Sequence, residues 1–207
     1  MKYSKEEIEA AIVDAPEPVE NNDNLIDVGA FQLDNGIDLI NNAVHFVGEV
    51  TPESVADIIN RMGFMYNVNS ETDINLMVSS NGGDLYALFG LIDFIDSLPV
   101  KVNVYVIGQA LSSAGILLAC TTGQRVVGKN SIVLFHDGEI TMGGKYDDIK
   151  IQKDHMEKMS DTVLDMLVEK TSMNRDFWID KTKNDLYLDA EQCIAFGIAD
   201  RIGGFYG

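Results

Sequence analysis

The chain has 207 residues, 46% of them apolar, and a formal net charge of −18. This length and apolar content predict one α/β domain with a sizeable core. The acidic balance disfavours nucleic acid and anionic membranes as partners, because no basic cluster offsets phosphate repulsion. No apolar stretch reaches the length of a bilayer span, and the first residues are charged where a signal peptide is apolar, so we expect a cytoplasmic protein.

The first forty residues differ in character from the remainder. Residues 6–12 (EEIEAAI) predict a short helix, and the polar, proline-containing residues 14–24 are expected to be mobile. We therefore expect a partly mobile N-terminal segment over 1–40 and a folded domain over 41–207.

Strand and helix patterns alternate along the next part of the chain. Thr51 is the expected N-cap of a helix whose first residue is Pro52. The alternation predicts parallel strands joined by right-handed crossovers, with active groups at the strand ends. The expected strands are 43–47, 74–80 and 101–107, and the expected helices are 51–65 and 85–98.

Residues 146–170 have the pattern of a long amphipathic helix. Apolar residues recur among charged ones at roughly helical spacing. Such a helix either closes over its own domain or contributes to self-assembly. The apolar stripe comprises Ile149, Met156, Met159, Val163, Met166 and Leu167.

The segment GQALSSAGILLA, residues 108–119, places Ser112 and Ser113 between a β-branched run and an apolar, alanine-rich helix pattern. Unpaired N–H groups and the helix dipole at such a position can stabilise a developing oxyanion. Serine is also among the commonest N-caps, so this motif taken alone favours the simpler interpretation that Ser112 caps a buried helix.

His136 ends the apolar run 131–135 just before a predicted turn, a position that suits a general base. The other two histidines are less suitable, because His45 lies inside an apolar run and His155 lies among charges. Asp185, which enters a short strand-like LYL, is a candidate for the acid that orients the imidazole. Thirty-three acidic residues are present, and periodicity does not choose among them.

Cys120 and Cys193 lack the spacing of metal ligands and are expected to be buried thiols. The sequence therefore implies no disulfide and no metal.

Four motifs together resemble the proteolytic subunits of Clp proteases, the ClpP family. GQALSSAGILLA is similar to the family's GQAAS and leucine-rich helix, NSIVLFHDG to its histidine segment, and SSNGGD to its NSPGG loop. NDLYLDAEQCIAFGIADRI is similar to the family's RDRFLSA-type ending. The motifs follow family order over about residues 40–203, with no gap between Gly83 and Ser112.

The resemblance implies that Ser112 is the nucleophile, His136 the general base and Asp185 the orienting acid. It also implies an oxyanion hole formed by the backbone N–H groups of Gly83 and Ser113. Ser113 is an alternative nucleophile, since S-A-G resembles the S-x-G of related peptidases, but that choice requires a gap after GQA.

The implied fold is the ClpP/crotonase fold of repeated βαβ units, with residues 146–170 as a protruding handle helix. The implied activity is a serine endopeptidase that hydrolyses unfolded polypeptides inside a barrel of two seven-membered rings, fed by a hexameric ATP-dependent Clp unfoldase. ATP would be used by that partner, because this chain has no GxxxxGK[ST] loop, and no cofactor is implied in the chain itself.

Some positions depart from the family pattern. Asn81 replaces the proline of the PGG loop, Asp137 and Gly138 replace Gln-Pro, and the first forty residues lack the basic axial-loop pattern. Three other functions stay open: a crotonase-like acyl-CoA enzyme, a catalytically silent scaffold subunit, and a viral capsid-maturation protease of the same family.

Overall fold

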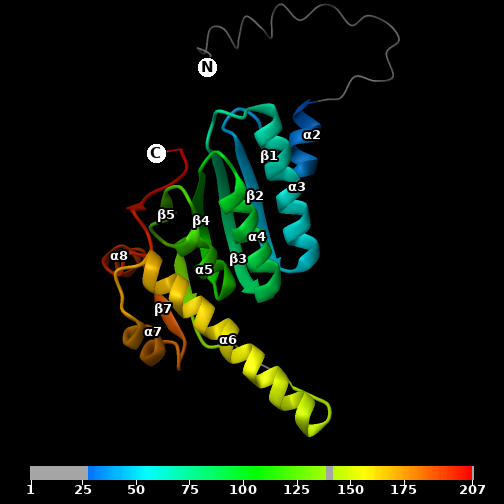
Figure 1. Ribbon diagram of the computed structural model, residues 1–207. Coiled ribbons are helices and arrows are strands. Elements are labelled where there is room, and N and C mark those ends of the chain that lie inside the picture. The colour runs from blue at the N-terminus through cyan, green and yellow to red at the C-terminus, as the bar shows by residue number, and fades with distance from the viewer. Residues whose placement is uncertain (1–27, 139–141, 207) are drawn as a thin grey trace, which may run out of the picture. The chain divides into compact units, whose positions relative to one another are not determined.

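The structure is a computed structural model that describes residues 28–138 and 142–206 (Figure 1). The helix predicted over 6–12 and the mobile segment predicted over 14–24 lie outside the described residues. By its internal contacts the chain divides into residues 1–31 and 32–207, and the second unit holds the sheet and every predicted site residue. Helix α2 (Val28–Asn35) crosses this division.

One mixed sheet forms the centre of the second unit, which confirms the predicted α/β class (Figure 1). Its main path runs β1-β2-β3-β4-β5-β8, while β6 pairs with β4 and with β7. The β1–β2 and β6–β7 pairs are antiparallel, and the other pairs are parallel. The strands are β1 (Ile37–Asp38), β2 (Ala43–Val50), β3 (Ile74–Gly83), β4 (Val102–Leu111), β5 (Arg125–Val127), β6 (Ile132–Phe135), β7 (Leu186–Leu188) and β8 (Arg201–Ile202).

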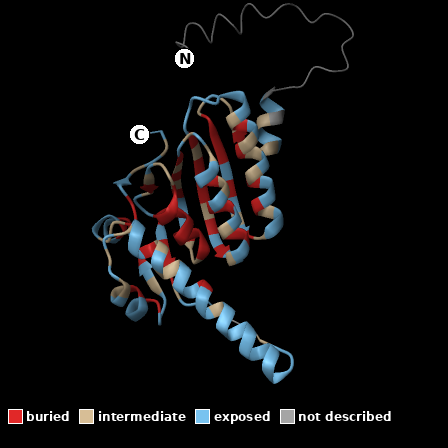
Figure 2. Ribbon diagram, in the orientation of Figure 1, coloured by how far each residue is buried: buried red, intermediate tan, exposed pale blue. Residues whose placement is uncertain are grey.

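Three helices pack on one face of this sheet: α3 (Pro52–Val68), α4 (Leu85–Ser97) and α5 (Ser113–Cys120) (Figure 1). The predicted start of α3 is confirmed, because the Thr51 hydroxyl accepts a hydrogen bond from the N–H of Ser54 and Pro52 is the first helical residue. All eight residues of α5 are buried (Figure 2). The helix that follows the two serines is thus part of the core.

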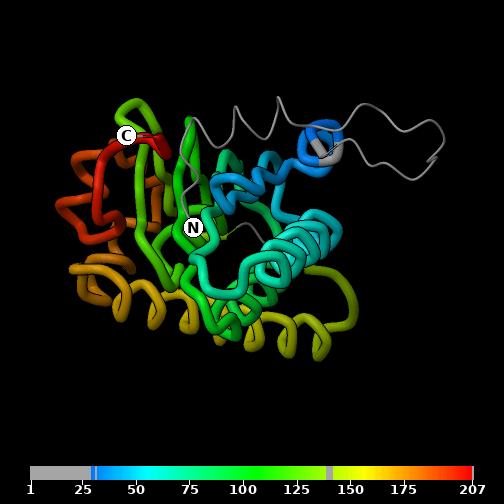
Figure 3. The backbone as a smooth tube through the Cα atoms, turned by 90° about the horizontal axis from the view of Figure 1, so that it is seen from above, coloured from blue at the N-terminus to red at the C-terminus, as the bar shows by residue number. Residues whose placement is uncertain are grey.

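Helix α6 (Tyr146–Lys170) covers the range predicted for the amphipathic helix. Its C-terminal half packs against α5 and α7 (Arg175–Lys181), and Met159 and Leu167 are buried there. Its N-terminal half extends beyond the sheet and is exposed (Figures 1 and 2). Seen from above, α6 lies on the same side of the sheet as α4 and α5 (Figure 3). Much of the apolar stripe is therefore covered by its own chain.

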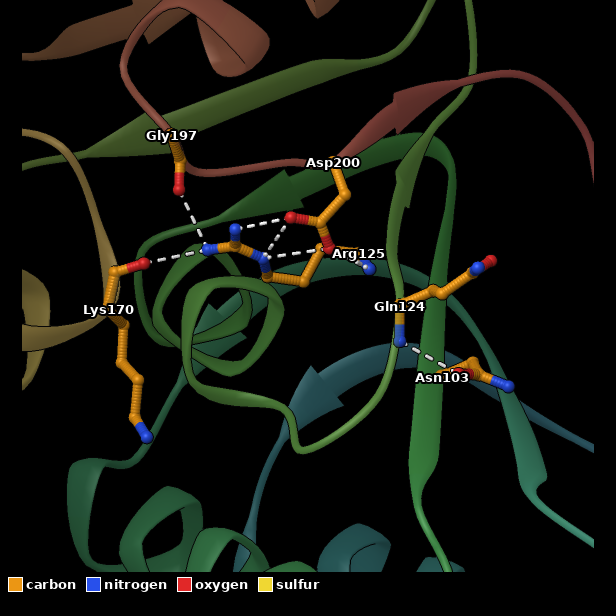
Figure 4. A network of polar contacts seen from close by, with 6 residues as sticks. All are labelled: Asn103, Gln124, Arg125, Lys170, Gly197 and Asp200. Atoms are coloured by element: carbon orange, nitrogen blue, oxygen red, sulfur yellow. Dashed lines mark hydrogen bonds and ion pairs between the residues drawn. The ribbon is translucent and has the colours of Figure 1, made fainter.

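Arg125, on β5, joins three segments that are distant in sequence (Figure 4). Its Nη1 donates to the carbonyl oxygens of Lys170, at the end of α6, and Gly197, at 2.8 and 2.7 Å. Its Nη2 forms a 2.5 Å ion pair with Asp200. Hydrogen bonds from Arg125 hold the pKa of the Asp200 carboxyl below its ordinary value. The root of α6 is thereby tied to the segment between α8 (Ala190–Ala195) and β8.

Cys120 and Cys193 are free and buried, as predicted. Burial raises the pKa of each thiol to about 12, so both are poor nucleophiles at neutral pH. In the described ranges, no group of three or more His, Cys, Asp or Glu side chains is placed to hold a metal ion. None of the helices within those ranges combines the length and apolar character needed to cross a membrane.

Candidate active site

Ser112 lies between the end of β4 and the first residue of α5. Its N–H donates to the carbonyl oxygen of Leu134 on β6 at 2.9 Å, which fixes the turn against that strand. Its backbone has φ +55° and ψ −122°, a strained conformation for a residue with a side chain. Although Ser112 occupies the N-cap position, its side chain makes no capping hydrogen bond to the described helix. The structure thus does not support a role for this hydroxyl as a simple cap.

Ser113 has the opposite environment. It is 0% exposed, and its hydroxyl oxygen has no hydrogen-bond partner among the residues that the structure describes. Ser112 is partly exposed. Of the two serines, Ser112 is therefore the one that solvent or a substrate reaches without rearrangement of the core.

His136 and Asp185 are brought together by the pairing of β6 with β7. This antiparallel pair places Phe135 opposite Leu186, so the same register continued by one residue puts His136 opposite Asp185. The distance between His136 Nδ1 and Asp185 Oδ1 is 3.8 Å. Their side chains are 28% and 56% exposed, so both are open to solvent. This separation is within ion-pair range but longer than a hydrogen bond.

The serine and the histidine come from neighbouring strands but are not hydrogen-bonded to each other in the described residues. Strands β4 and β6 run parallel, with Leu111 paired to Leu134, so Ser112 and His136 follow adjacent strand ends. Within the described residues, no hydrogen bond joins the Ser112 hydroxyl to the His136 imidazole. The predicted acid and base are thus close together, while the base makes no hydrogen bond to the predicted nucleophile.

The glycine loop at the end of β3 lies against the two serines through Gly82. A Cβ on Gly82 would lie 2.3 Å from the carbonyl oxygen of Leu111, 2.8 Å from Ser112 Cβ and 3.0 Å from Ser113 N. At φ +82° and with these neighbours, no other residue fits.

Gly83, the predicted oxyanion-hole residue, follows Gly82, and the side on which a Cβ would stand faces β2. A Cβ there would lie 2.2 Å from the carbonyl oxygen of Val50. The close approach of Gly82 to Ser112 is a second feature of this loop that two consecutive glycines in the sequence do not reveal, and the role of the Gly83 N–H stays a prediction.

The other two histidines lie outside this group of residues. His45 is exposed on β2 and lines a cavity of about 320 Å³ together with Arg61 and Asp57. His155 is on α6, where its Nε2 lies 2.9 Å from the Tyr86 hydroxyl at the start of α4. His155 is exposed, and its contact with a second helix is not visible in the sequence.

Comparisons with known proteins agree with the fold. The family model described as Clp protease matches residues 35–204. The ATP-dependent Clp protease proteolytic subunit of Deinococcus radiodurans is 24% identical over 166 residues, which is 79% of this chain and 81% of that protein. Proteolytic subunit 1 of Corynebacterium glutamicum is 31% identical over 168 residues, 79% of this chain and 80% of that protein. Proteolytic subunit 1 of Rhodopirellula baltica is 28% identical over 171 residues, which is 82% of this chain and 75% of that protein. This chain belongs to the Clp protease family and is a Clp-type peptidase.

Proposed function

We propose that this chain is a serine endopeptidase in which Ser112 is the nucleophile, His136 the general base and Asp185 the orienting acid. The observation that carries the proposal is the strand register. It places His136 opposite Asp185, and it ties Ser112 by a backbone hydrogen bond to Leu134, two residues before His136. A nucleophile, a base and an orienting acid on adjacent strand ends are the parts that acyl transfer requires.

The reaction begins with attack of Ser112 Oγ on a peptide carbonyl, while His136 takes the hydroxyl proton and later protonates the leaving amine. Backbone N–H groups of Gly83 and Ser113 stabilise the oxyanion, because they lie at a strand end and at a helix N-terminus. Water then hydrolyses the acyl-enzyme, with His136 again acting as base.

The 3.8 Å separation of His136 and Asp185 is about 1 Å longer than a charge-assisted hydrogen bond. Catalysis therefore requires a small closure of this pair, together with a hydrogen bond from the Ser112 hydroxyl to His136. Such contacts commonly tighten when substrate binds.

The working enzyme in this proposal is an assembly of copies of this chain, two stacked heptameric rings in the cytoplasm. It receives unfolded polypeptides from a hexameric Clp ATPase, and that partner uses the ATP. The names of the relatives, ATP-dependent proteolytic subunits, support the partnership. Self-assembly is supported by the exposed half of α6, where Tyr146 is 83% and Ile151 68% exposed, since large apolar side chains favour burial in an interface.

A fluorophosphonate probe tests the proposal, because it labels a serine only when a base activates the hydroxyl. We expect one modified residue, Ser112, by peptide mass spectrometry, together with loss of hydrolysis of a fluorogenic peptide. The Ser112→Ala variant is expected to be unlabelled and inactive. Labelling at Ser113, or peptide hydrolysis by Ser112→Ala, would refute the assignment of the nucleophile.

A further inference from the structure

His136 is held on both sides by one neighbouring segment. On its N-terminal side, the ring of Phe135 packs against Trp178 of α7, with 4.9 Å between ring centroids. On its C-terminal side, the N–H of Asp137 donates to the carbonyl oxygen of Thr182 at 2.9 Å. The position of the imidazole along the strand end therefore depends on Trp178 and Thr182.

Thr182 is itself fixed by two hydrogen bonds to a single acceptor. Its N–H and its Oγ1 both donate to the carbonyl oxygen of Trp178, at 3.0 and 2.8 Å. Thr182 is 7% exposed, so its hydroxyl has little access to water as a substitute partner. These two bonds hold Thr182 at the end of α7, where its carbonyl oxygen accepts the hydrogen bond from Asp137.

Trp178 extends the same network to the end of α6. It is fully buried, and its indole Nε1 donates to Oγ1 of Thr171, the C-cap residue of α6, at 3.3 Å. A large buried aromatic side chain with a satisfied N–H is a rigid support.

The acid lies on the same short segment as this support. Asp185 follows Thr182 by three residues and directly precedes β7, which pairs with the strand of His136. A shift of Thr182 therefore changes the separation of His136 and Asp185 from both sides at once. Since the pair already stands at 3.8 Å, further separation would weaken the orientation of the imidazole.

We propose that Thr182 and Trp178 are positioning residues that hold His136 opposite Asp185. Neither residue touches substrate; both act through the backbone on the two sides of the imidazole. The inference rests on the proposed function, because it assigns a role to these residues in the same catalytic group.

The Thr182→Val variant tests this inference, because it removes the hydroxyl and keeps the branched shape. We expect kcat for a fluorogenic peptide to fall about five- to tenfold while KM changes by less than about twofold, because substrate contacts are untouched. The rate of fluorophosphonate labelling of Ser112 should fall in parallel with kcat. Thr182→Ser keeps the hydroxyl and is expected to retain kcat within about twofold.

Thr121→Val is the matched control. Thr121 is 8% exposed and its hydroxyl also donates to a buried backbone carbonyl, that of Val102, but it lies at the far end of α5 from Ser112. The two valine variants should lose similar thermal stability, and only Thr182→Val should lose kcat. Equal kcat values for the two variants, or a Thr182→Ser variant as slow as Thr182→Val, would overturn the positioning role.

Two further results keep the inference separate from the proposed function. If Thr182→Val does not fold, Trp178→Phe replaces it as the test, because phenylalanine retains the ring packing and removes the Nε1 hydrogen bond. We expect Trp178→Phe to show the same selective loss of kcat, and a normal kcat in this variant overturns the inference. If Ser112→Ala remains active, the proposed nucleophile fails. If Ser112→Ala is inactive and Thr182→Val is fully active, only the positioning role fails.

Discussion

Replacing Ser113 by alanine is expected to stabilise the protein and to leave peptide hydrolysis intact. The Ser113 hydroxyl is completely buried and has no hydrogen-bond partner among the described residues. Leaving such a group unpaired costs about 1–3 kcal/mol relative to a paired or hydrated one. Alanine is also a better helix former than serine by a few tenths of a kcal/mol, about 0.5 at most.

The expected change in the free energy of unfolding follows from these two stabilising contributions and one opposing contribution. Removal of one oxygen leaves a small void that costs well under about 1 kcal/mol, because no methylene group is lost. The net gain in the free energy of unfolding is therefore about 1–2 kcal/mol. For a domain of this size this corresponds to a rise in melting temperature of roughly 2–8 °C.

Urea unfolding and thermal melting of wild type, Ser113→Ala and Ser112→Ala at one protein concentration measure the effect, since assembly makes stability concentration-dependent. Hydrolysis of a fluorogenic peptide is measured in parallel. Ser112→Ala serves as the control that loses activity without a comparable gain in stability. A Ser113→Ala variant that is less stable than wild type would show that its hydroxyl has a partner. A stable but inactive Ser113→Ala variant would transfer the nucleophile to Ser113.

Three other predictions concern separate parts of the molecule. Asp185→Asn should lower kcat by about 10²- to 10⁴-fold with an unchanged circular dichroism spectrum, because the amide favours the wrong imidazole tautomer. Unchanged turnover would contradict the role of Asp185 as the orienting acid. Hydrogen bonds from Arg125 lower the pKa of the Asp200 carboxyl in the folded protein, so its contribution to stability should be present above the ordinary carboxyl pKa of 3.8 and lost as pH falls through the lowered pKa. Urea unfolding of wild type and Asp200→Asn at neutral pH and at pH values below the ordinary carboxyl pKa checks this, and a difference in stability that is independent of pH would contradict it. Ile151→Asp should reduce the sedimenting mass of the assembly without unfolding the protomer. Met159→Asp should instead unfold the protomer, because Met159 is buried within its own chain. If Ile151→Asp sediments like wild type, α6 does not form the proposed interface.

Local signals were enough to predict the elements that carry the candidate site. Thr51 and Pro52 mark the start of α3 because N-capping depends on residues within one turn. The bounds of α6 were predictable for a similar reason, since a long helical repeat of apolar residues can be recognised without knowledge of tertiary contacts. The positions of Ser112 and His136 at element ends followed from the same local patterns.

The choice of Asp185 depended on information that no local pattern contains. In the structure Asp185 lies opposite His136 because β6 pairs with β7. These two short strands are separated by about fifty residues, and their register is set by long-range packing. The roles of Gly82 and Thr182 were hidden for the same reason. Gly82 is required by the approach of the Leu111 and Ser112 backbone, and Thr182 acts through a carbonyl that contacts Asp137.

The two halves of α6 are under different physical constraints, and this links the fold to the proposed assembly. The C-terminal half is fixed by Met159 and Leu167 in the core and by the contact of Arg125 with the Lys170 carbonyl. The N-terminal half extends from that fixed root with exposed apolar side chains, among them Ile151. Because Trp178 contacts the C-cap of α6 and supports the strand of His136, contacts made along α6 by a second copy would act on the same support that positions the imidazole.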